Sequence, residues 1–506
     1  MRRIWLLVLS LWLPAAQAAL QPDLSRLDAL PLHVASPAVT AKAIEAAENV
    51  KGRGPALFAV TVPLPVDLSG GVWDEQAGVG RWRTRVYSAG AQALLMEFTR
   101  FHVPDGASLW IYDAAGRTVQ GPYDARNHSP EGSLWTALVP GETAVLELRV
   151  PSVKRGDVEL ALGRLGHAYK NARDLGDSGP CNIDTACPLG DAWRDEIRSV
   201  VKLQIPSGDN VGLCSGTLIN NLAQDDKAYV MTADHCGIRN SSPPSGVVVY
   251  WNFQNSACNG ADNAPDDQTQ TGAVLRARDE ATDLSLLELS QRPSAAFNVY
   301  YAGWDASGTG GDSGVSIHHP SGDAKKVTEF TTPLVQSSIR LPGGDFDIPA
   351  WRVTWSQGTT EQGSSGSGLW NQDRRIVGVL SGGSASCAQS DDPDFYARLD
   401  RQWTAQPQAS GQLKAWLDAV DTGLRQVAGK EAGAGPVPTP APSPTPTPTA
   451  SPAPTASPGD GGGGGGGTVS PWLLVLLLAA GAGRRLVHGR RSGCAAYGAA
   501  LPPIGR

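Results

Sequence analysis

The most informative stretch of the chain covers residues 363–370 and reads GSSGSGLW, a glycine- and serine-rich turn that runs into apolar residues. The run IVGVL at residues 376–380 follows it and predicts a β-strand that supports the turn. Glycines let another group approach a tight turn closely. The turn therefore makes Ser365 a candidate nucleophile and aims the backbone N–H groups of Gly363 and Ser365 at one oxygen.

A nucleophilic hydroxyl needs a base to accept its proton and a third group to orient that base. The cysteine-bearing part of the chain holds only three histidines, His235, His318 and His319. The apolar run YVMTAD at residues 229–234 leads directly into His235, which makes it the candidate base. His318 and His319 are neighbours that point to opposite faces of an extended chain, so we expect structural roles for both.

The candidate orienting group is Asp283, at the head of the apolar run LSLLEL at residues 284–289. A strand there would hold its carboxylate against an imidazole, whereas a solvated loop acid is the alternative for an aspartate considered alone. The chain order His235, Asp283, Ser365 favours the catalytic assignment. An α/β-hydrolase is disfavoured, because it needs a glycine where Ser367 stands and places its acid and base after the serine.

These motifs together resemble the chymotrypsin-like serine proteases, whose chain order is His, Asp, Ser, and more closely the bacterial lysyl endopeptidases. The resemblance covers roughly residues 176–426 and includes the runs CNID at 181–184, VYWN at 249–252, AGWD at 302–305 and IHHP at 317–320. It implies an all-β fold of two six-stranded antiparallel β-barrels. It also implies hydrolysis of peptide bonds through an acyl-enzyme, with no cofactor.

Seven cysteines are present, of which six lie between residues 181 and 387 and one, Cys494, lies alone in the tail. An even number in an exported domain predicts disulfides, although six cysteines allow fifteen pairings. The alternative, a metal site, lacks a Cys-x-x-Cys pair at zinc spacing, so we expect no metal. The resemblance implies three bridges: Cys181 with Cys387, Cys187 with Cys258, and Cys214 with Cys236.

The resemblance further implies an aspartate at the base of the primary specificity pocket, and alignment on DFYAR at residues 394–398 places it at Asp394. A buried carboxylate there would attract a cationic side chain. The alternative is a solvated acidic loop that also contains Asp391 and Asp392. Cleavage after Lys is therefore the expected activity.

One departure from the family affects specificity. The family's histidine before the Gly-Gly pair is Ser381 here, and its tryptophan partner falls near Leu341, so the stacked rings that narrow the pocket are missing. We therefore expect cleavage after Arg as well as Lys, with reduced discrimination. The alternatives are a serine protease of different primary specificity and a catalytically idle surface binding module.

The N-terminal part of the chain has two expected segments. Residues 1–19 combine a basic start, an apolar run and a small-residue end, which predicts a secretory signal peptide, with a buried helix as the alternative. Residues 20–175 contain no cysteine and show short alternating apolar runs, which predicts a β-rich pro-region; a binding domain kept in the mature protein is the alternative. The protease domain then spans residues 176–429.

The C-terminal part is expected to be a tether and a sorting tail. Residues 430–467 are rich in Pro, Thr and Ser and end in a glycine run, which predicts an unfolded linker. Residues 468–506 carry the apolar run PWLLVLLLAA followed by Arg484, Arg485, Arg490 and Arg491, and they resemble the GlyGly-CTERM sorting signal of Gram-negative bacteria. This implies a transmembrane helix, transient membrane association and removal by a sorting protease; a permanent anchor is the alternative.

The net charge of the chain and its expected export limit the partners that it can bind. The net charge of −7 disfavours non-specific nucleic-acid binding. We expect a monomer, secreted or on the cell surface, that acts on protein or peptide substrates. Ser364 stands where trypsin-like zymogens carry an aspartate that pairs with a new N-terminus, so activation is expected from self-cleavage near Lys170 or Arg173 instead.

Overall fold

The computed structural model describes residues 22–48, 54–170, 178–239 and 243–435. These residues form mainly β-strands and short 3-10 turns. The α-helices among them are α1 (Pro37–Glu48), α2 (Arg194–Ile197), α3 (Leu399–Gln402) and α4 (Lys414–Leu417). The all-β fold class expected from the sequence is therefore confirmed.

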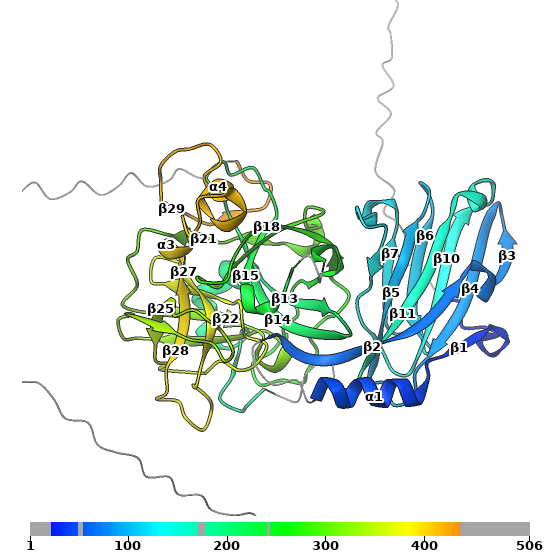
Figure 1. Cartoon of the computed structure of the whole chain (residues 1–506), viewed down its shortest axis with the longest axis horizontal. Helices are drawn as coiled ribbons and strands as arrows, with labels where there is room; N and C mark the ends of the chain where they lie inside the picture. Colours follow the sequence, from blue (N-terminus) through cyan, green and yellow to red (C-terminus); the bar gives the residue numbers. More distant parts are fainter. Residues whose placement is uncertain (1–21, 49–53, 171–177, 240–242, 436–506) are drawn as a thin grey trace, which may run out of the picture. The chain divides into compact units, whose positions relative to one another are not determined.

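The strands of the N-terminal domain, residues 22–170, form two sheets (Figure 1). One has the order β1-β4-β10-β6-β7 with β3 on β4, and the other contains β2, β11, β5, β8 and β9. The bounds are β1 (Leu32–Val34), β2 (Ala56–Asp67), β3 (Val72–Gln76), β4 (Val79–Tyr87), β5 (Ala93–His102), β6 (Ser108–Asp113), β7 (Val119–Tyr123), β8 (Leu134–Trp135), β9 (Val139–Pro140), β10 (Thr143–Pro151) and β11 (Glu159–Ala168).

Strand β10 illustrates how the sequence builds the core of this domain. Leu146, Leu148 and Val150 alternate along it and are fully buried in a core that also contains residues of β2, β5 and β11. The alternation places all three side chains on one face of the strand. Glu147, between them, is also buried, and its carboxylate accepts the Tyr112 hydroxyl at 3.0 Å, which offsets the cost of burying a charge.

The candidate protease domain, predicted to span residues 176–429, lies within the described residues 178–435, which contain the remaining strands. Their bounds are β12 (Ile183–Asp184), β13 (Val200–Ser207), β14 (Asn210–Ile219), β15 (Tyr229–Ala233), β16 (Val248–Tyr250), β17 (Thr269–Thr271), β18 (Ala273–Asp279), β19 (Leu284–Leu289), β20 (Tyr300–Tyr301), β21 (Gly303–Asp305), β22 (Gly314–His318), β23 (Lys326–Phe330), β24 (Val335–Ile339), β25 (Ile348–Val353), β26 (Gly368–Asn371), β27 (Arg375–Gly383), β28 (Asp394–Arg398), β29 (Gln426–Val427) and β30 (Lys430–Glu431).

The strand count differs from the simple expectation of six strands in each barrel, which is not confirmed. Within the described residues, β13 to β19 belong to one sheet. A second sheet holds ten strands, β12 and β21 to β29. Short strands such as β12 and β29 extend the second sheet at its margins.

The first sheet of the candidate protease domain continues into the N-terminal domain. Strand β2 pairs antiparallel with β14, and the register places Ala56 opposite Leu213 and Val60 opposite Asn210. Side chains of both domains share one buried core there, among them Phe58, Ala59, Trp135, Val211, Leu213, Tyr250 and Phe253. The two domains are therefore joined by main-chain hydrogen bonds and by apolar packing.

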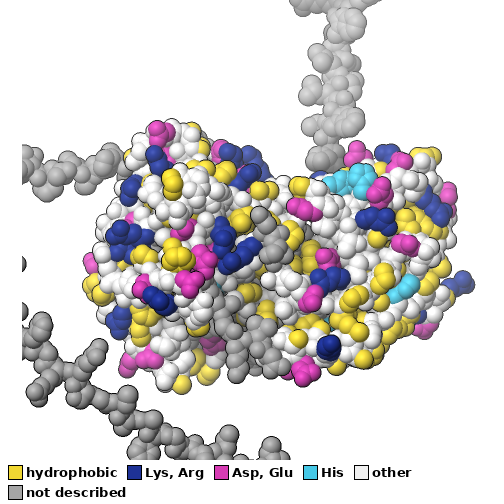
Figure 2. Space-filling view, in the orientation of Figure 1, with side chains coloured by type: hydrophobic (Ala, Val, Ile, Leu, Met, Phe, Trp, Pro, Cys, Tyr) yellow, Lys and Arg dark blue, Asp and Glu magenta, His cyan; other side chains and the backbone are white. Residues whose placement is uncertain are grey.

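Two further features of the described residues are the distribution of charge on the surface and the length of the helices. Acidic and basic side chains are interspersed over the face shown in Figure 2. The expected transmembrane helix is wrong: no helix in the described parts of the chain is long and apolar enough to cross a membrane. The apolar run that suggested it is short of the roughly 20 residues a span needs, and the whole tail lies outside the described residues.

Candidate active site

Two adjacent strands bring His235 and Asp283 together. Strand β15 ends at Ala233, β19 begins at Leu284, and these two residues are opposite each other in the antiparallel pair. The Nδ1 atom of His235 lies 2.9 Å from Asp283 Oδ2, and the His235 backbone N–H donates to Asp283 Oδ1 at 2.9 Å. Asp283 is 0% exposed and His235 is 6% exposed. The carboxylate therefore fixes both the ring and the backbone of the candidate base.

Asp283 has a further partner that the sequence did not indicate. The Ser381 hydroxyl donates to Asp283 Oδ2 at 2.6 Å. The sequence interpretation assigned Ser381 to the specificity pocket, whereas its side chain contacts the carboxylate that orients His235. The contact joins residues 98 positions apart, and no local pattern could have predicted it.

The turn that carries Ser365 lies against the turn that carries His235. The Ser365 carbonyl accepts the Ser215 N–H at 2.8 Å and lies 3.9 Å from Cys236 Sγ. A Cβ on Gly366 would lie only 2.1 Å from Thr232 Oγ1, so this approach requires glycine. Between the described residues no hydrogen bond joins the side chains of Ser365 and His235. Such bonds are often long in the unliganded state and tighten with substrate.

The expected oxyanion donors lie on this same turn. Gly363 has φ of 93°, a left-handed conformation that favours glycine. Its carbonyl accepts the Ser215 hydroxyl at 2.9 Å. Among the described residues, no partner takes the N–H of Gly363 or of Ser365. Both donors are thus available for an oxygen that develops negative charge.

His318 and Ser364 make a buried contact next to the turn that carries Ser365. His318 Nδ1 lies 2.8 Å from Ser364 Oγ, and both residues are fully buried. Burial, helped by the charge of Lys326, lowers the pKa of His318 to about 3. The imidazole is therefore neutral near pH 7. His319, also buried, contacts the Asp323 carbonyl through Nδ1 at 2.9 Å.

Three disulfides lie within the candidate protease domain. They join Cys181 to Cys387, Cys187 to Cys258, and Cys214 to Cys236, the pairs that the resemblance implied. The bridge between Cys214 and Cys236 connects β14 to the residue after His235. It therefore fixes the turn of the candidate base to the neighbouring strand.

Asp394 lies at the start of β28 and is 1% exposed. Its Oδ2 atom accepts Trp355 Nε1 and Thr360 Oγ1, each at 2.7 Å. Burial raises the pKa of Asp394, and these two hydrogen bonds oppose that rise. Asp391, in contrast, is exposed. The solvated-loop alternative therefore describes Asp391 but not Asp394.

The position expected to lose the family's tryptophan is apolar. Leu341 is buried with Ile348 and Ala397. A Cβ on Gly382, next to Ser381, would be 3.4 Å from Leu341 Cδ2. An aliphatic side chain thus lies beside the Gly-Gly pair where the family carries a ring.

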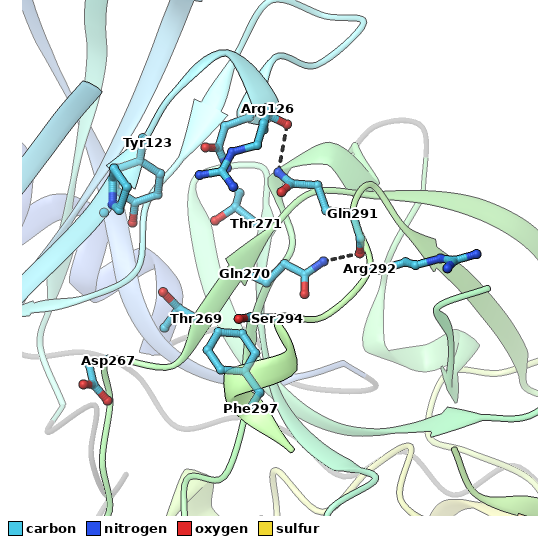
Figure 3. A pocket seen from close by; sticks show the side chains of 13 residues that line it. Tyr123, Arg126, Asp267, Thr269, Gln270, Thr271, Gln291, Arg292, Ser294 and Phe297 are labelled. Atoms are coloured by element: carbon cyan, nitrogen blue, oxygen red, sulfur yellow. Dashed lines mark hydrogen bonds between the residues drawn. The ribbon is translucent and has the colours of Figure 1, made fainter. Parts of the chain in front are cut away.

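A separate polar cavity of about 410 Å³ lies between β7 and the segment from β17 to Phe297. Figure 3 shows Gln291 directed at Arg126, whose carbonyl accepts the Gln291 amide at 2.8 Å. None of its lining residues belongs to the candidate triad. The cavity is therefore a feature of the contact between the domains rather than of the chemistry.

Comparisons with known proteins agree with this arrangement. Residues 175–397 match the family model described as "Lysyl endopeptidase, C-terminal domain". A lysyl endopeptidase of Pseudomonas aeruginosa is 30% identical over 364 residues, which cover 65% of this chain and 74% of that protein.

Solved structures with some likeness are also proteases. The active form of the Rv3671c protease from M. tuberculosis shares 19% identity with a TM-score of 0.31, over 47% of this chain and 93% of that one. The serine endoprotease from Yersinia pestis shares 20% identity with a TM-score of 0.28, over 42% of this chain and 62% of that one. Because these TM-scores are low, the family assignment depends on the sequence matches. The sequence matches show that the chain belongs to the lysyl endopeptidase family of serine proteases.

Proposed function

We propose that this chain is a secreted serine endopeptidase that cleaves peptide bonds after Lys and, with reduced discrimination, after Arg. The observation that carries the specificity is the Asp394 carboxylate, which is buried and held by Trp355 and Thr360. A buried carboxylate favours a cationic side chain and disfavours an anionic one. Membership of the lysyl endopeptidase family supports the same assignment.

The chemistry assigns one role to each group of the candidate triad. His235 accepts the proton of the Ser365 hydroxyl as the oxygen attacks the scissile carbonyl carbon, and it later gives that proton to the leaving amine. Asp283 orients the imidazole and stabilises its protonated form. The N–H groups of Gly363 and Ser365 stabilise the oxyanion. Water then attacks the acyl-enzyme by the same route.

The N-terminal domain acts in this proposal as a pro-region that is cut from the protease domain beyond Lys170. It is bound through the pairing of β2 with β14 and through a buried polar contact. In that contact Gln204 Nε2 donates to the Thr136 carbonyl at 3.1 Å, and the Tyr250 hydroxyl accepts the Leu138 N–H at 3.0 Å. A sorting protease that removes residues 468–506 completes the proposed maturation. The disulfides support an extracellular destination.

Two measurements test the specificity and the nucleophile. Turnover of matched peptides ending in Lys, Arg, Glu or Phe should rank Lys and Arg far above Glu and Phe; a preference for Glu or Phe rejects the pocket assignment. An organophosphonate should label the chain at Ser365 and leave Ser365→Ala unlabelled. No labelling of the unaltered chain would favour the catalytically idle binding module.

Self-processing has its own test. Ser365→Ala should accumulate as the longer form that retains residues 20–175, because no active protease is present to cut it. Intact mass and N-terminal sequencing of the secreted product identify the form. Normal maturation of Ser365→Ala would assign the cut to another protease.

A further inference from the structure

Glu361 connects three segments of the protease domain at the turn that carries the nucleophile. Its Oε1 atom accepts the Gly179 N–H at 2.8 Å and the Asn182 amide at 2.7 Å. Its Oε2 atom accepts the Ser321 hydroxyl at 2.7 Å. One half-buried carboxylate therefore holds the first residues of the protease domain and the 319–323 loop together.

The backbone of Glu361 extends this connection into the nucleophile turn. The Glu361 N–H donates to Ser364 Oγ at 3.1 Å, and the Ser364 N–H donates to the Glu361 carbonyl at 3.0 Å. These two bonds close a short loop that ends one residue before Ser365. Any displacement of Glu361 is thus transmitted directly to the nucleophile.

The 319–323 loop, the second segment held by Glu361, lies against the first oxyanion donor. A Cβ on Gly363 would be 2.9 Å from both the His319 carbonyl oxygen and the Gly322 nitrogen. The Ser321 N–H also donates to the Gln362 carbonyl at 2.6 Å. The loop therefore sets the direction of the peptide that presents the Gly363 N–H.

The first residues of the protease domain are themselves firmly anchored. Cys181 is bridged to Cys387, and the Ser178 hydroxyl donates to Asp323 Oδ2 at 2.5 Å. A Cβ on Gly179 would lie 2.9 Å from Glu361 Oε1 and 2.6 Å from Cys387 Sγ, so only glycine allows the carboxylate to come this close. The carboxylate thus bonds to a fixed point rather than to a free end.

Resting on the proposed function of Ser365, we propose that Glu361 is a positioning residue for the oxyanion hole. It links the backbone of Gly179 to the turn from Gly363 to Ser365 and thereby holds the two oxyanion N–H groups in their productive direction. Position 364 is a serine, which cannot pair with an N-terminal ammonium as an aspartate would. The link through Glu361 uses a backbone N–H inside the chain, so it requires no free amine.

The test compares four variants in the processed enzyme, with every rate expressed per active site titrated by organophosphonate. Glu361→Ala should lower kcat about 10- to 100-fold, because a small misplacement of oxyanion donors has effects of this size. KM for a Lys peptide should change little, since the interaction acts in the transition state. The kcat of Glu361→Gln should fall less, because its amide oxygen can still accept a hydrogen bond from the Gly179 N–H and its NH2 group can donate one to Ser321. Ser321→Ala removes one of the three contacts and should also show a partial loss.

The matched control is Glu329→Ala, which removes a carboxylate whose side chain bonds only Gln357 among the hydrogen bonds of the described residues. It should leave kcat unchanged. A peptidyl boronic acid, which forms a tetrahedral adduct with the nucleophile, separates positioning from stability. Its affinity for Glu361→Ala should fall by the same factor as kcat, while KM for the Lys peptide stays constant.

Unchanged kcat and boronic acid affinity in Glu361→Ala, with normal labelling of the unaltered enzyme, would overturn this inference alone. A loss of kcat in Glu361→Ala that is no larger than the loss in Glu329→Ala would also overturn this inference. If Glu361→Ala does not fold, equal kcat values for Glu361→Gln, Ser321→Ala and the unaltered enzyme overturn it. Absence of labelling in the unaltered enzyme would overturn the proposed function and this inference together.

Discussion

Asp283 holds His235 at two points, because its carboxylate bonds both the ring Nδ1 and the backbone N–H of the histidine, each at 2.9 Å. A bond to the ring alone would allow the imidazole to move with its turn. The second bond fixes the turn itself. The carboxylate therefore determines the position of the candidate base as well as its orientation.

Asp283→Asn is expected to lower kcat by roughly 10⁴-fold, the size of loss that this change causes in Ser-His-Asp triads. The amide keeps the size of the side chain but favours the wrong tautomer of the imidazole. Steady-state kinetics with a Lys peptide measure the loss. Asp279→Asn, four residues away and bonded to Thr282 and Gln406, is the control and should stay close to the unaltered rate.

Ser381→Ala removes the 2.6 Å hydrogen bond to Asp283. A hydrogen bond to a charged group is worth about 1.5–3 kcal/mol, so kcat/KM should fall about 10- to 100-fold. Ser381→Thr, which keeps the hydroxyl, should restore most of the activity. The exposed Ser384 supplies the control, Ser384→Ala. A Thr variant as slow as the Ala variant would show that the hydroxyl is not what matters.

Asp394→Asn should reduce kcat/KM for Lys and Arg peptides roughly 30- to 4,000-fold, since loss of one partner of a buried charge pair costs about 2–5 kcal/mol. Peptides ending in Phe should be affected far less, so the ratio of the two rates is the quantity to measure. Asp391→Asn changes an exposed acid and should preserve the preference. Equal effects of the two variants would restore the solvated-loop interpretation.

Asp394→Asn should also stabilise the fold at neutral pH. Burial raises the pKa of Asp394, so the folded state binds a proton more tightly than the unfolded state does. The resulting stability is present below the ordinary aspartate pKa of about 3.9 and is lost as pH rises through the raised value. Asp394→Asn should therefore unfold at higher urea concentration than the unaltered chain at pH 7, with the difference disappearing near pH 4. A less stable variant at pH 7 would contradict this.

Phe58→Ala tests the core shared by the two domains. Phe58 is fully buried there, and removal of a buried phenylalanine side chain costs about 3–5 kcal/mol. Urea unfolding of the uncut chain, kept uncut by Ser365→Ala, should show this loss. Val153→Ala, at a side chain that is 94% exposed, should show none. Equal midpoints for the two variants would mean that the shared core contributes little.

The sequence predicted those parts of the site that are local in the chain. His235 follows an apolar run, Asp283 precedes one and Ser365 lies in a glycine-rich turn, so the local sequence marks each of the three candidate residues. The resemblance supplied the pairing of the cysteines and the place of Asp394. These features depend on short motifs, and one sequence is enough to recognise them.

The contacts that the sequence did not reveal join distant residues. Gly179 and Glu361 are 182 positions apart in the sequence, and the hydrogen-bonded pair Trp355 and Asp394 is separated by 39 positions. Nor did the alternation of β2 indicate that its partner would be β14, 150 residues further along, because both faces of each strand are largely buried. Hydrophobic pattern predicts that a strand forms, but the choice of neighbour depends on the whole fold.

The bridge between Cys181 and Cys387 spans 206 residues and encloses all three candidate triad residues. A single internal nick anywhere within that span leaves both fragments covalently joined. Autolysis within this span would therefore be invisible on a non-reducing gel, where a nicked molecule migrates as one band, and would appear only after treatment with a thiol. Preparations should be compared with and without reductant before any loss of activity is attributed to unfolding.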